Sequence, residues 1–455
     1  MENREKLLRE ESIGKLLFKL SLPAMVGMMV NALYNMVDTI FVGNGVGALA
    51  IGGLTVAFPI QMAIMSLALL VGIGAQANIS ISFGAGQIDK ANQYAGNAYA
   101  LMTIIAITLS VLGLIFIVPI LQLFGASATL LPYARDYMQI IFFGSVALSL
   151  SVVNSNVLRA EGNAKMAMVL MIIGMGLNII LDPIFIFGFK MGIRGAALAT
   201  VISQFVGLGC AVYYMSTGNS IIKISRTTLR LKFQYVRDII KLGFPTFIRQ
   251  IAGSILAIFL NNGIVFYGGD IALSAFGIIN RVMMFLFLPM FGIVQGFQPI
   301  AGFNYGALAI DRVKQVVKTA TKALIVYCVT GLIVILTLHV PILRLFTDDQ
   351  QALAIGAYAI KIMFLGIPIV GLQIISASFF QAIGKAKPAL VLSLMRQVLM
   401  LLPLIIIMPQ LFNLGLTGIW LAFPLSDIAS TLISILILRK EWKALDHLAP
   451  SEQTT

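Results

Sequence analysis

Four polar side chains in the first apolar segment recur at a spacing that would place them on one face of a helix. Asn31, Tyr34, Asn35 and Asp38 stand at positions i, i+3, i+4 and i+7. A carboxylate in the lipid core of a membrane costs about 2.5–3.5 kcal/mol on insertion scales, so it normally faces a protected interior or a watery cavity. Asp38 is therefore a candidate functional residue, although a hydrogen bond that only packs two helices would also explain it.

A second acid, Asp182, stands in a later apolar segment. Gly174, Asn178 and Asp182 are spaced at i, i+4 and i+8, and Pro183 follows at once. Proline lacks a backbone N–H and disfavours helix in the residue before it, so a kink here would free carbonyl groups beside the carboxylate. Asp182 is a second candidate, with service to the kink alone as the alternative.

The next apolar segment adds hydroxyl and amide oxygens from Thr200, Ser203 and Gln204. Together with two carboxylates, such oxygens suit Na⁺ or a shared proton. Zinc or iron would require Cys or His ligands. The chain has only two cysteines and two histidines, and both cysteines, Cys210 and Cys328, fall in apolar segments where packing explains them. Without a nucleophile–base pair or a metal cluster, we expect no enzymatic activity and no organic cofactor.

The elements that carry these side chains are long apolar segments. The chain is 59% hydrophobic and 11% charged, with a mean hydropathy of +0.97, whereas soluble proteins carry about 25% charged residues. About 20 apolar residues cross a bilayer, and the sequence predicts twelve such spans. They are residues 16–41, 50–78, 94–118, 133–157, 165–187, 193–215, 240–266, 273–300, 318–340, 356–380, 388–409 and 415–438. The predicted fold is an all-α polytopic membrane protein.

The Lys and Arg residues that give the net charge of +13 are concentrated on one side of the predicted spans. The termini and the even-numbered loops, together with the adjoining ends of the spans, hold 23 of the 31 Lys and Arg residues. The positive-inside rule then places both termini in the cytoplasm and makes the number of spans even. The basic surplus indicates contact with anionic lipid and not with nucleic acid.

The sequence also repeats itself in one constant register, in which position 20 falls on position 242. Leu20–Pro23 aligns with Leu242–Pro245, and Val118–Phe124 matches Val340–Phe346 at six of seven positions. Two six-span halves that enter from the same side are parallel repeats related by an axis along the membrane normal. This architecture, with a cleft between two bundles, is typical of transporters, although a duplication could also have built only a larger bundle.

The repeat predicts five parts. An amphipathic N-terminal segment, residues 1–15, is expected to lie on the cytoplasmic membrane surface. The N-terminal bundle takes residues 16–215, and a basic cytoplasmic linker takes 216–239. The C-terminal bundle takes residues 240–438, and a cytoplasmic tail takes 439–455.

Charges inside the spans differ between the two halves. The repeat carries Asp38 to Leu260, or to Asn262 if the local register moves by two positions, and carries Asp182 to Leu404. The acids are therefore a specialisation of one half. The second half instead holds three arginines and one acid, for which we expect structural roles such as pairing or snorkelling. These residues are Arg249, Arg281, Arg396 and Asp427.

These features resemble the multidrug and toxic compound extrusion (MATE) family. The resemblance rests on the Leu-Pro that opens each half, on Tyr34…Asp38-Thr39-Ile40-Phe41-Val42-Gly43, and on Asn178-Ile179-Ile180-Leu181-Asp182-Pro183 followed by Gly192…Gly195-Ala196-Ala197. It covers residues 14–440 and is nearest to the DinF-type and MepA-like branch. The NorM-type branch has acids in spans seven and ten, which are absent here.

The resemblance implies an antiporter that exports amphipathic organic cations in exchange for H⁺ or Na⁺ by alternating access. It assigns ion coupling to Asp38, Asp182, Asn178, Thr200 and Tyr34, of which the first four would hold Na⁺ if sodium is the coupling ion. We expect the substrate surface to include two methionines and three amide side chains. They are Met28, Met171, Asn31, Asn35 and Gln204. We expect a monomer in the plasma membrane of a bacterium or an archaeon.

Two other functions fit parts of the sequence. A flippase for lipid-linked sugars or other anionic lipids would favour a basic cavity, which the three arginines of the second half suggest and the acid pair opposes. A passive channel would require a repeated selectivity ring, and the sequence does not supply one.

Overall fold

The computed structural model describes residues 2–447, which form helices joined by short turns. Ten helices in this part of the chain are long and apolar enough to cross a membrane, and a bent pair of helices, α11 and α12, can form one more span. One of the ten, α9, is long enough for two spans. The predicted all-α membrane fold is therefore confirmed, and the helices accommodate the twelve predicted spans.

The first half of the chain contains eight α-helices and one π-helix, which is labelled η1. Their bounds are α1 Glu2–Glu10, α2 Ile13–Val46, α3 Ala48–Gly84, α4 Ile88–Ile115, α5 Ile117–Leu123, α6 Leu131–Ala160, α7 Ala164–Pro183, η1 Ile184–Gly188 and α8 Ile193–Ser216.

The second half begins with two helices that meet at a sharp break and share the label α9. Its elements are α9 Phe233–Gly306, α10 Ile310–Arg344, α11 Gln350–Met363, α12 Ile367–Ala382, α13 Ala386–Leu394, the π-helix η2 Met395–Leu401, α14 Leu402–Ile407, the 3₁₀-helix η3 Leu411–Asn413 and α15 Gly415–Asp446. In α9 the predicted spans seven and eight join at Gly269, whose φ of 69° breaks the helix. Glycine tolerates this conformation because it has no Cβ. The bend between α11 and α12 is 55°.

The chain divides into two compact units, which we describe separately. Among the described residues, the first unit is residues 2–9 and 22–243, and the second is residues 10–21 and 244–447. The expected N-terminal bundle began at residue 16, whereas residues 10–21, which include the start of α2, belong to the second unit. Residues 448–455 of the expected tail lie outside the described part, and residues 439–446 continue α15.

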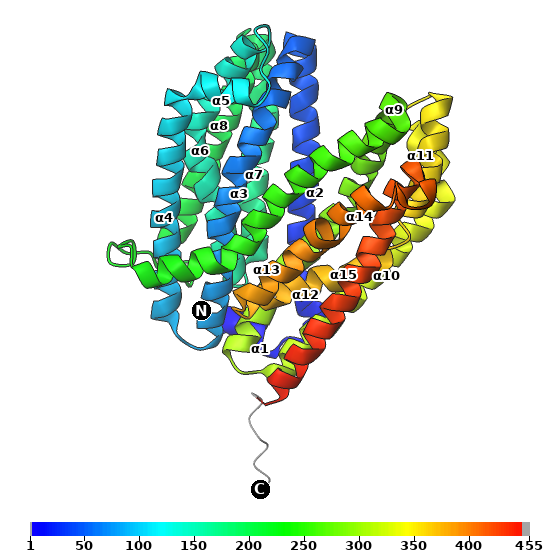
Figure 1. Cartoon of the computed structure of the whole chain (residues 1–455). Coiled ribbons are helices and arrows are strands. Elements are labelled where there is room, and N and C mark those ends of the chain that lie inside the picture. The colour runs from blue at the N-terminus through cyan, green and yellow to red at the C-terminus, as the bar shows by residue number, and fades with distance from the viewer. Residues whose placement is uncertain (1, 448–455) are drawn as a thin grey trace. The chain divides into compact units, whose positions relative to one another are not determined.

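Within the first unit, α3 packs against α4 and α6, and α8 packs against α6 and α7 (Figure 1). Small residues permit one particularly close helix contact. Gly74 of α3 lies directly against the backbone of Ile239, and Gly243 lies against the backbone of Leu70. A side chain larger than hydrogen at either glycine would collide with main-chain atoms, which cannot rotate away.

The basic segment 216–239 is not a free linker but is attached to the first unit. The side chain of Asn97 donates to the carbonyl of Thr228 at 3.1 Å and accepts from the backbone N–H of Lys232 at 2.7 Å. Tyr94 donates to Asp238 at 3.1 Å. These bonds hold the segment on α4, so the polar composition of this segment serves docking as well as solubility.

The N-terminal helix α1 is also held by the first unit. Arg4 forms an ion pair of 2.6 Å with Glu161, in the turn between α6 and α7, and donates to the hydroxyl of Tyr214 at 2.7 Å. Leu8 is fully buried and packs against Gly162 of the same turn. The segment predicted to lie on the membrane surface thus has specific protein contacts.

Within the second unit, α12 packs against α10, α13 and α15, and α15 also packs against α11 and η2 (Figure 1). Trp420 of α15 is buried and stacks on Phe276 of α9, with ring centroids 6.1 Å apart. The predicted packing role of Cys328 agrees with the structure, because this thiol is buried in α10. Cys210, in the first unit, is half-buried.

Candidate functional site

The two intramembrane acids of the first unit meet in the structure. Asp38 of α2 and Asp182 at the end of α7 are both buried, and their carboxyl groups lie within interaction range of each other. Two neighbouring carboxyl groups can share a proton when one of them is protonated, because the protonated group then has a hydrogen to donate. Asp38 Oδ1 is buried without a hydrogen-bond partner. The pair is therefore a candidate site for a proton or a cation, with an acceptor that is still unused.

Asn178 connects this pair to α8. Its amide nitrogen lies 3.4 Å from Asp182 Oδ1 and 3.3 Å from the hydroxyl oxygen of Thr200. The opposite orientation of the amide satisfies both neighbours better, since the nitrogen then donates to Asp182 Oδ2 at 2.9 Å and the oxygen accepts from the backbone N–H of Thr200 at 3.0 Å. In both orientations, hydrogen bonds through Asn178 connect the carboxyl group of Asp182 to Thr200 of α8.

Glycines bring these side chains within reach of one another. Gly174 in α7 and Gly207 in α8 face each other, with 3.8 Å between the Cα atom of Gly174 and the position of a Cβ on Gly207. Helices that meet through glycine approach closely. Asn178 is one turn from Gly174 and Thr200 is two turns from Gly207, so the close approach extends to the hydrogen bonds described above.

Asp182 lies where α7 changes its helical geometry. Pro183 is the last residue of α7, and the π-helix η1 follows directly. The predicted kink thus takes the form of a change from α- to π-helix. Gly195, at the start of α8, allows this segment to pack closely, because a Cβ there would stand 2.9 Å from the carbonyl carbon of Phe185. π-Helical turns occur frequently at functional sites.

Two tyrosines complete the surroundings of the acids. Tyr34 lies next to Thr200 and within electrostatic range of both acids. Tyr137 of α6 is buried, lies next to Gln61 of α3, and is within electrostatic range of Asp38. The sequence pattern did not indicate Tyr137 or Gln61. A tyrosine next to an exposed Arg–Asp pair resembles an interfacial residue, so no signal in one sequence would have identified it.

The structure therefore brings together the five residues expected to couple ions. The five residues expected to bind substrate do not form one cluster with them but make separate local contacts. Asn35 donates to the carbonyl and to the side-chain oxygen of Asn31, at 2.8 and 2.9 Å, within α2. Met171 packs against Gly27, and Gln204 against Gly144 of α6. Met28 is half-buried in α2. A role of these side chains in substrate binding stays a prediction.

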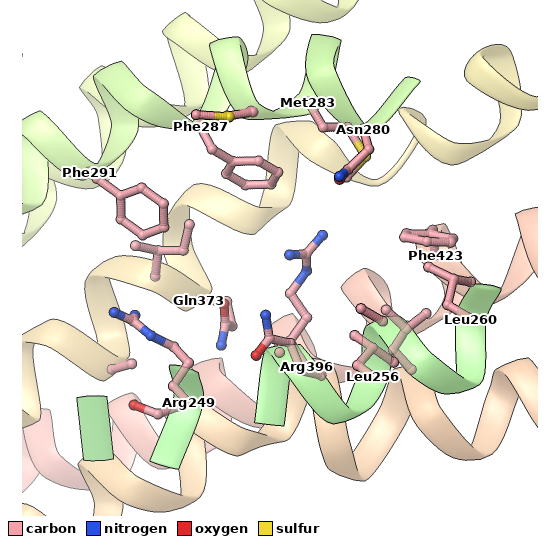
Figure 2. A pocket seen from close by; sticks show the side chains of 18 of the residues that line it. Arg249, Leu256, Leu260, Asn280, Met283, Phe287, Phe291, Gln373, Arg396 and Phe423 are labelled. Atoms are coloured by element: carbon pink, nitrogen blue, oxygen red, sulfur yellow. The ribbon is translucent and has the colours of Figure 1, made fainter. Parts of the chain in front are cut away.

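In the second unit, the expected pairing of an arginine with Asp427 is present. Arg396 donates to the buried Asp427 at 2.6 Å. Arg249 is half-buried and forms no salt bridge within residues 2–447, and Arg281 is exposed. Arg249 and Arg396 line a pocket of about 450 Å³ that lies within the second unit (Figure 2).

Comparison with known proteins agrees with the repeat and with the fold. The MatE family model matches residues 23–184 and again residues 245–407. The two matches begin at residues 23 and 245, which are the two prolines that fall on each other when the sequence is aligned with itself. The predicted duplication of a six-span unit is therefore supported independently.

Characterised relatives match over nearly the whole chain. The multidrug export protein MepA of Staphylococcus aureus strain MRSA252 is 26% identical over 432 residues, which cover 94% of this chain and 93% of that protein. An outward-facing MATE multidrug resistance transporter has a TM-score of 0.91 at 26% identity, covering 97% of this chain and 98% of that chain. A MATE structure in the bent conformation has a TM-score of 0.93 at 26% identity, covering 98% and 99%. Because the MatE model accounts for most of the chain in two copies, this protein belongs to the MatE family of membrane transporters.

Proposed function

We propose that this transporter exports amphipathic organic cations in exchange for H⁺ or Na⁺, and that Asp38 and Asp182 form its coupling site. The observation that carries the proposal is the buried pair of neighbouring carboxyl groups. A multidrug export protein is among the relatives that match the whole chain. A site that alternates between negative and neutral can hold a cation in one state and release it in the other.

The exchange requires three steps at this site. With both carboxyl groups ionised, or with one proton between them, the site attracts a cationic substrate. Entry of a proton or of Na⁺ then removes the negative charge, and the substrate leaves toward the outside. Asn178 transmits the change because it bonds to Asp182 and to Thr200, and the junction of α7 and η1 at Pro183 supplies a place where the helix can bend.

Sodium and hydrogen ions make different demands on the site. Na⁺ would require several oxygens around it, for which the carboxylates of Asp38 and Asp182, the amide oxygen of Asn178 and the hydroxyl of Thr200 are available. A proton requires only the two carboxyl groups. We therefore propose the same four residues for either ion, with Asn178 and Thr200 needed as direct ligands only in the sodium case.

Transport into everted vesicles tests the proposal. A fluorescent organic cation should accumulate when the lumen is acidic, when it contains Na⁺, or in both cases, and the two gradients are imposed separately. Asp38→Asn should abolish accumulation, because the site then stays neutral at this position. Asp89→Asn makes the same chemical change at an exposed position, and it should transport like the wild type.

Equal transport by Asp38→Asn and the wild type, at equal protein content in the vesicles, would contradict the proposal. So would uptake that neither gradient drives, since the carrier would then be uncoupled. If Asp38→Asn transport is still driven by the ion gradient and only the affinity for the fluorescent cation falls, Asp38 belongs to the substrate-binding surface and not to the coupling site.

We further propose that the protein works as a monomer in the plasma membrane of a bacterium or an archaeon, with both termini in the cytoplasm. The distribution of Lys and Arg supports this orientation. A protease-sensitive tag at either terminus should be cut in everted vesicles and protected in intact cells. Cleavage in intact cells would reverse the orientation.

A further inference from the structure

The pocket of the second unit is a defined ligand-sized cavity that the acid pair does not use. Its volume is about 450 Å³, within the range of about 300–1,000 Å³ typical of small-molecule sites. The two parts of α9 on either side of Gly269 provide most of its walls, and α12, α13, η2 and α15 provide the rest. In Figure 2, Phe287 and Phe291 lie on one side and the side chains of Arg249 and Arg396 lie opposite them.

Each guanidinium group of the pocket lies over an aromatic ring. The Cζ atom of Arg249 is 5.8 Å from the centroid of Phe291, and that of Arg396 is 5.5 Å from the centroid of Phe287. The two rings are themselves 6.3 Å apart. These cation–π contacts orient the planar groups while leaving the N–H donors at their edges available for other bonds.

The pocket has a positive charge that the lining does not neutralise. Of the described residues that line it, none is Asp or Glu. Asp427 compensates Arg396 from behind the lining, through the bond of 2.6 Å, and Arg249 forms no salt bridge within residues 2–447. One positive charge therefore remains, and an uncompensated charge in an apolar, membrane-buried pocket is costly unless an ion of opposite sign joins it.

The internal repeat shows that this pocket and the acid pair of the first half carry charges of opposite sign at different positions of the repeat. In the register that places position 20 on position 242, both pocket arginines align with glycines, while a leucine of the pocket aligns with an acid of the coupling site. The matched positions are Gly27 with Arg249, Gly174 with Arg396, and Asp38 with Leu260. In the first half, Met171 packs against the glycine that corresponds to Arg249. At matched positions of the repeat, the second half thus has cations where the first half has glycines, and a leucine where the first half has an acid.

We propose that this pocket binds an amphipathic organic anion. A carboxylate, sulfonate or phosphate group accepts hydrogen bonds from the guanidinium groups of Arg249 and Arg396, since the planar fork of arginine matches such oxyanions. The aromatic or alkyl body of the ligand packs against Phe287, Phe291 and Met283. The amides of Asn261 and Asn280, which also line the pocket, bind further oxygens of the ligand.

A matched pair of fluorescent probes tests the sign of the preferred charge. Dansylglycine carries a carboxylate and dansylcadaverine an ammonium on the same fluorophore, whose emission rises in apolar surroundings. With the purified protein in phosphatidylcholine nanodiscs, dansylglycine should give a saturable signal. Arg249→Gln should weaken its binding by at least about tenfold, because hydrogen bonds to a charged group are lost. The binding of dansylcadaverine should not weaken in this variant.

Arg281→Gln is the matched control. It removes the same charge from the same helix, next to the pocket residue Asn280, but its side chain is exposed and does not line the pocket. This variant should bind dansylglycine like the wild type. Arg249→Lys keeps the charge but not the planar fork, so it should bind with intermediate affinity. Arg249 is preferred to Arg396 for this test because no acid loses its partner.

Three results would overturn the proposal: equal binding of both probes to the wild type, no effect of Arg249→Gln on dansylglycine, or an equal effect of Arg281→Gln. A folded Arg249→Gln protein is verified by its elution volume and by a thermal unfolding midpoint close to that of the wild type. If gradient-driven transport of the fluorescent cation is absent in the wild type while anion binding persists, the proposed export function fails and the pocket stands.

Two sources could supply the oxyanion, a membrane lipid or a soluble compound. Titration of phosphatidylglycerol into the nanodiscs distinguishes them. Competition with dansylglycine that Arg249→Gln abolishes identifies the lipid headgroup as the ligand. If phosphatidylglycerol does not compete and 1-naphthalenesulfonate does, the ligand is a soluble anion.

Discussion

Removal of the carboxylate of Glu161 should release two segments of the first unit at once. This buried side chain lies between α6 and α7 and accepts four hydrogen bonds, one from α1 and three from residues 220–222. Its partners are Arg4 at 2.6 Å, the hydroxyl of Ser220 at 2.8 Å, and the backbone N–H groups of Ile221 at 2.7 Å and Ile222 at 3.4 Å. Glu161→Ala would leave α1 without its ion pair and residues 220–222 without the carboxylate that holds them.

The magnitude follows from burial and charge. A hydrogen bond to a charged group contributes about 1.5–3 kcal/mol, and loss of one partner of a buried ion pair costs about 3–5 kcal/mol. Because the four bonds share one carboxylate, their contributions do not add, and about 4 kcal/mol is a reasonable value for the local opening. Since each step of about 1.4 kcal/mol is a factor of ten, the opened state should become several hundredfold more populated.

Hydrogen exchange measured by mass spectrometry is the appropriate assay, because it reports local opening segment by segment. Amides of residues 219–223 and of α1 should lose protection by that factor in Glu161→Ala, whereas α7 should change little. Asp136→Ala is the control. It breaks the exposed pair of 2.8 Å with Arg194, which should cost only about 0.2–1 kcal/mol, less than about tenfold in exchange.

Two results would refute this reasoning. Unchanged protection of residues 219–223 in Glu161→Ala would mean that other contacts hold the segment. An equal loss of protection throughout the first unit would mean that the carboxylate stabilises the whole bundle and not a local connection.

Three further changes test other parts of the structure. Thr200→Val, which removes the hydroxyl next to Asn178 but keeps the shape, should lower gradient-driven cation transport by about tenfold at normal expression, as measured in everted vesicles. Gly74→Val should reduce the yield of folded protein in detergent, because its side chain meets main-chain atoms, while Gly209→Val, which faces open space, should not. Arg396→Gln should destabilise the second unit by about 3–5 kcal/mol in thermal unfolding, and the added change Asp427→Asn should restore much of the loss.

Much of the fold could be predicted from the sequence because hydropathy and repetition are strong signals in a membrane protein. The lengths of the apolar segments indicated the spans, and the constant register of the internal repeat indicated the duplication. The break between the predicted spans seven and eight falls at Gly269, inside the predicted gap of residues 267–272. Its sharpness was not predicted, since hydropathy falls at the same point whether the chain forms a loop or a break of one residue. The attachment of residues 216–239 was also missed, because a polar composition is compatible with both a free and a docked segment.

The candidate site shows the same division. The spacing around Asp38 and Asp182 predicted two polar faces, and the structure brings both acids together. Tyr137 faces the acids because of the rotation of α6 about its axis, and this rotation cannot be predicted from a single sequence. The pocket beside Arg249 escaped prediction for a related reason, since a cavity is a property of helices that fail to fill space and not of any one helix.

The duplication described above has an evolutionary consequence. A single ancestral unit of six helices supplied two equivalent backbones, and a substitution in one copy placed no demand on the other. The two copies now differ in charge, with acidic residues in one at positions 38 and 182 and basic residues in the other at positions 249 and 396. A protein of this kind can acquire opposite chemical preferences on one inherited scaffold, through a few codon changes and without a new fold.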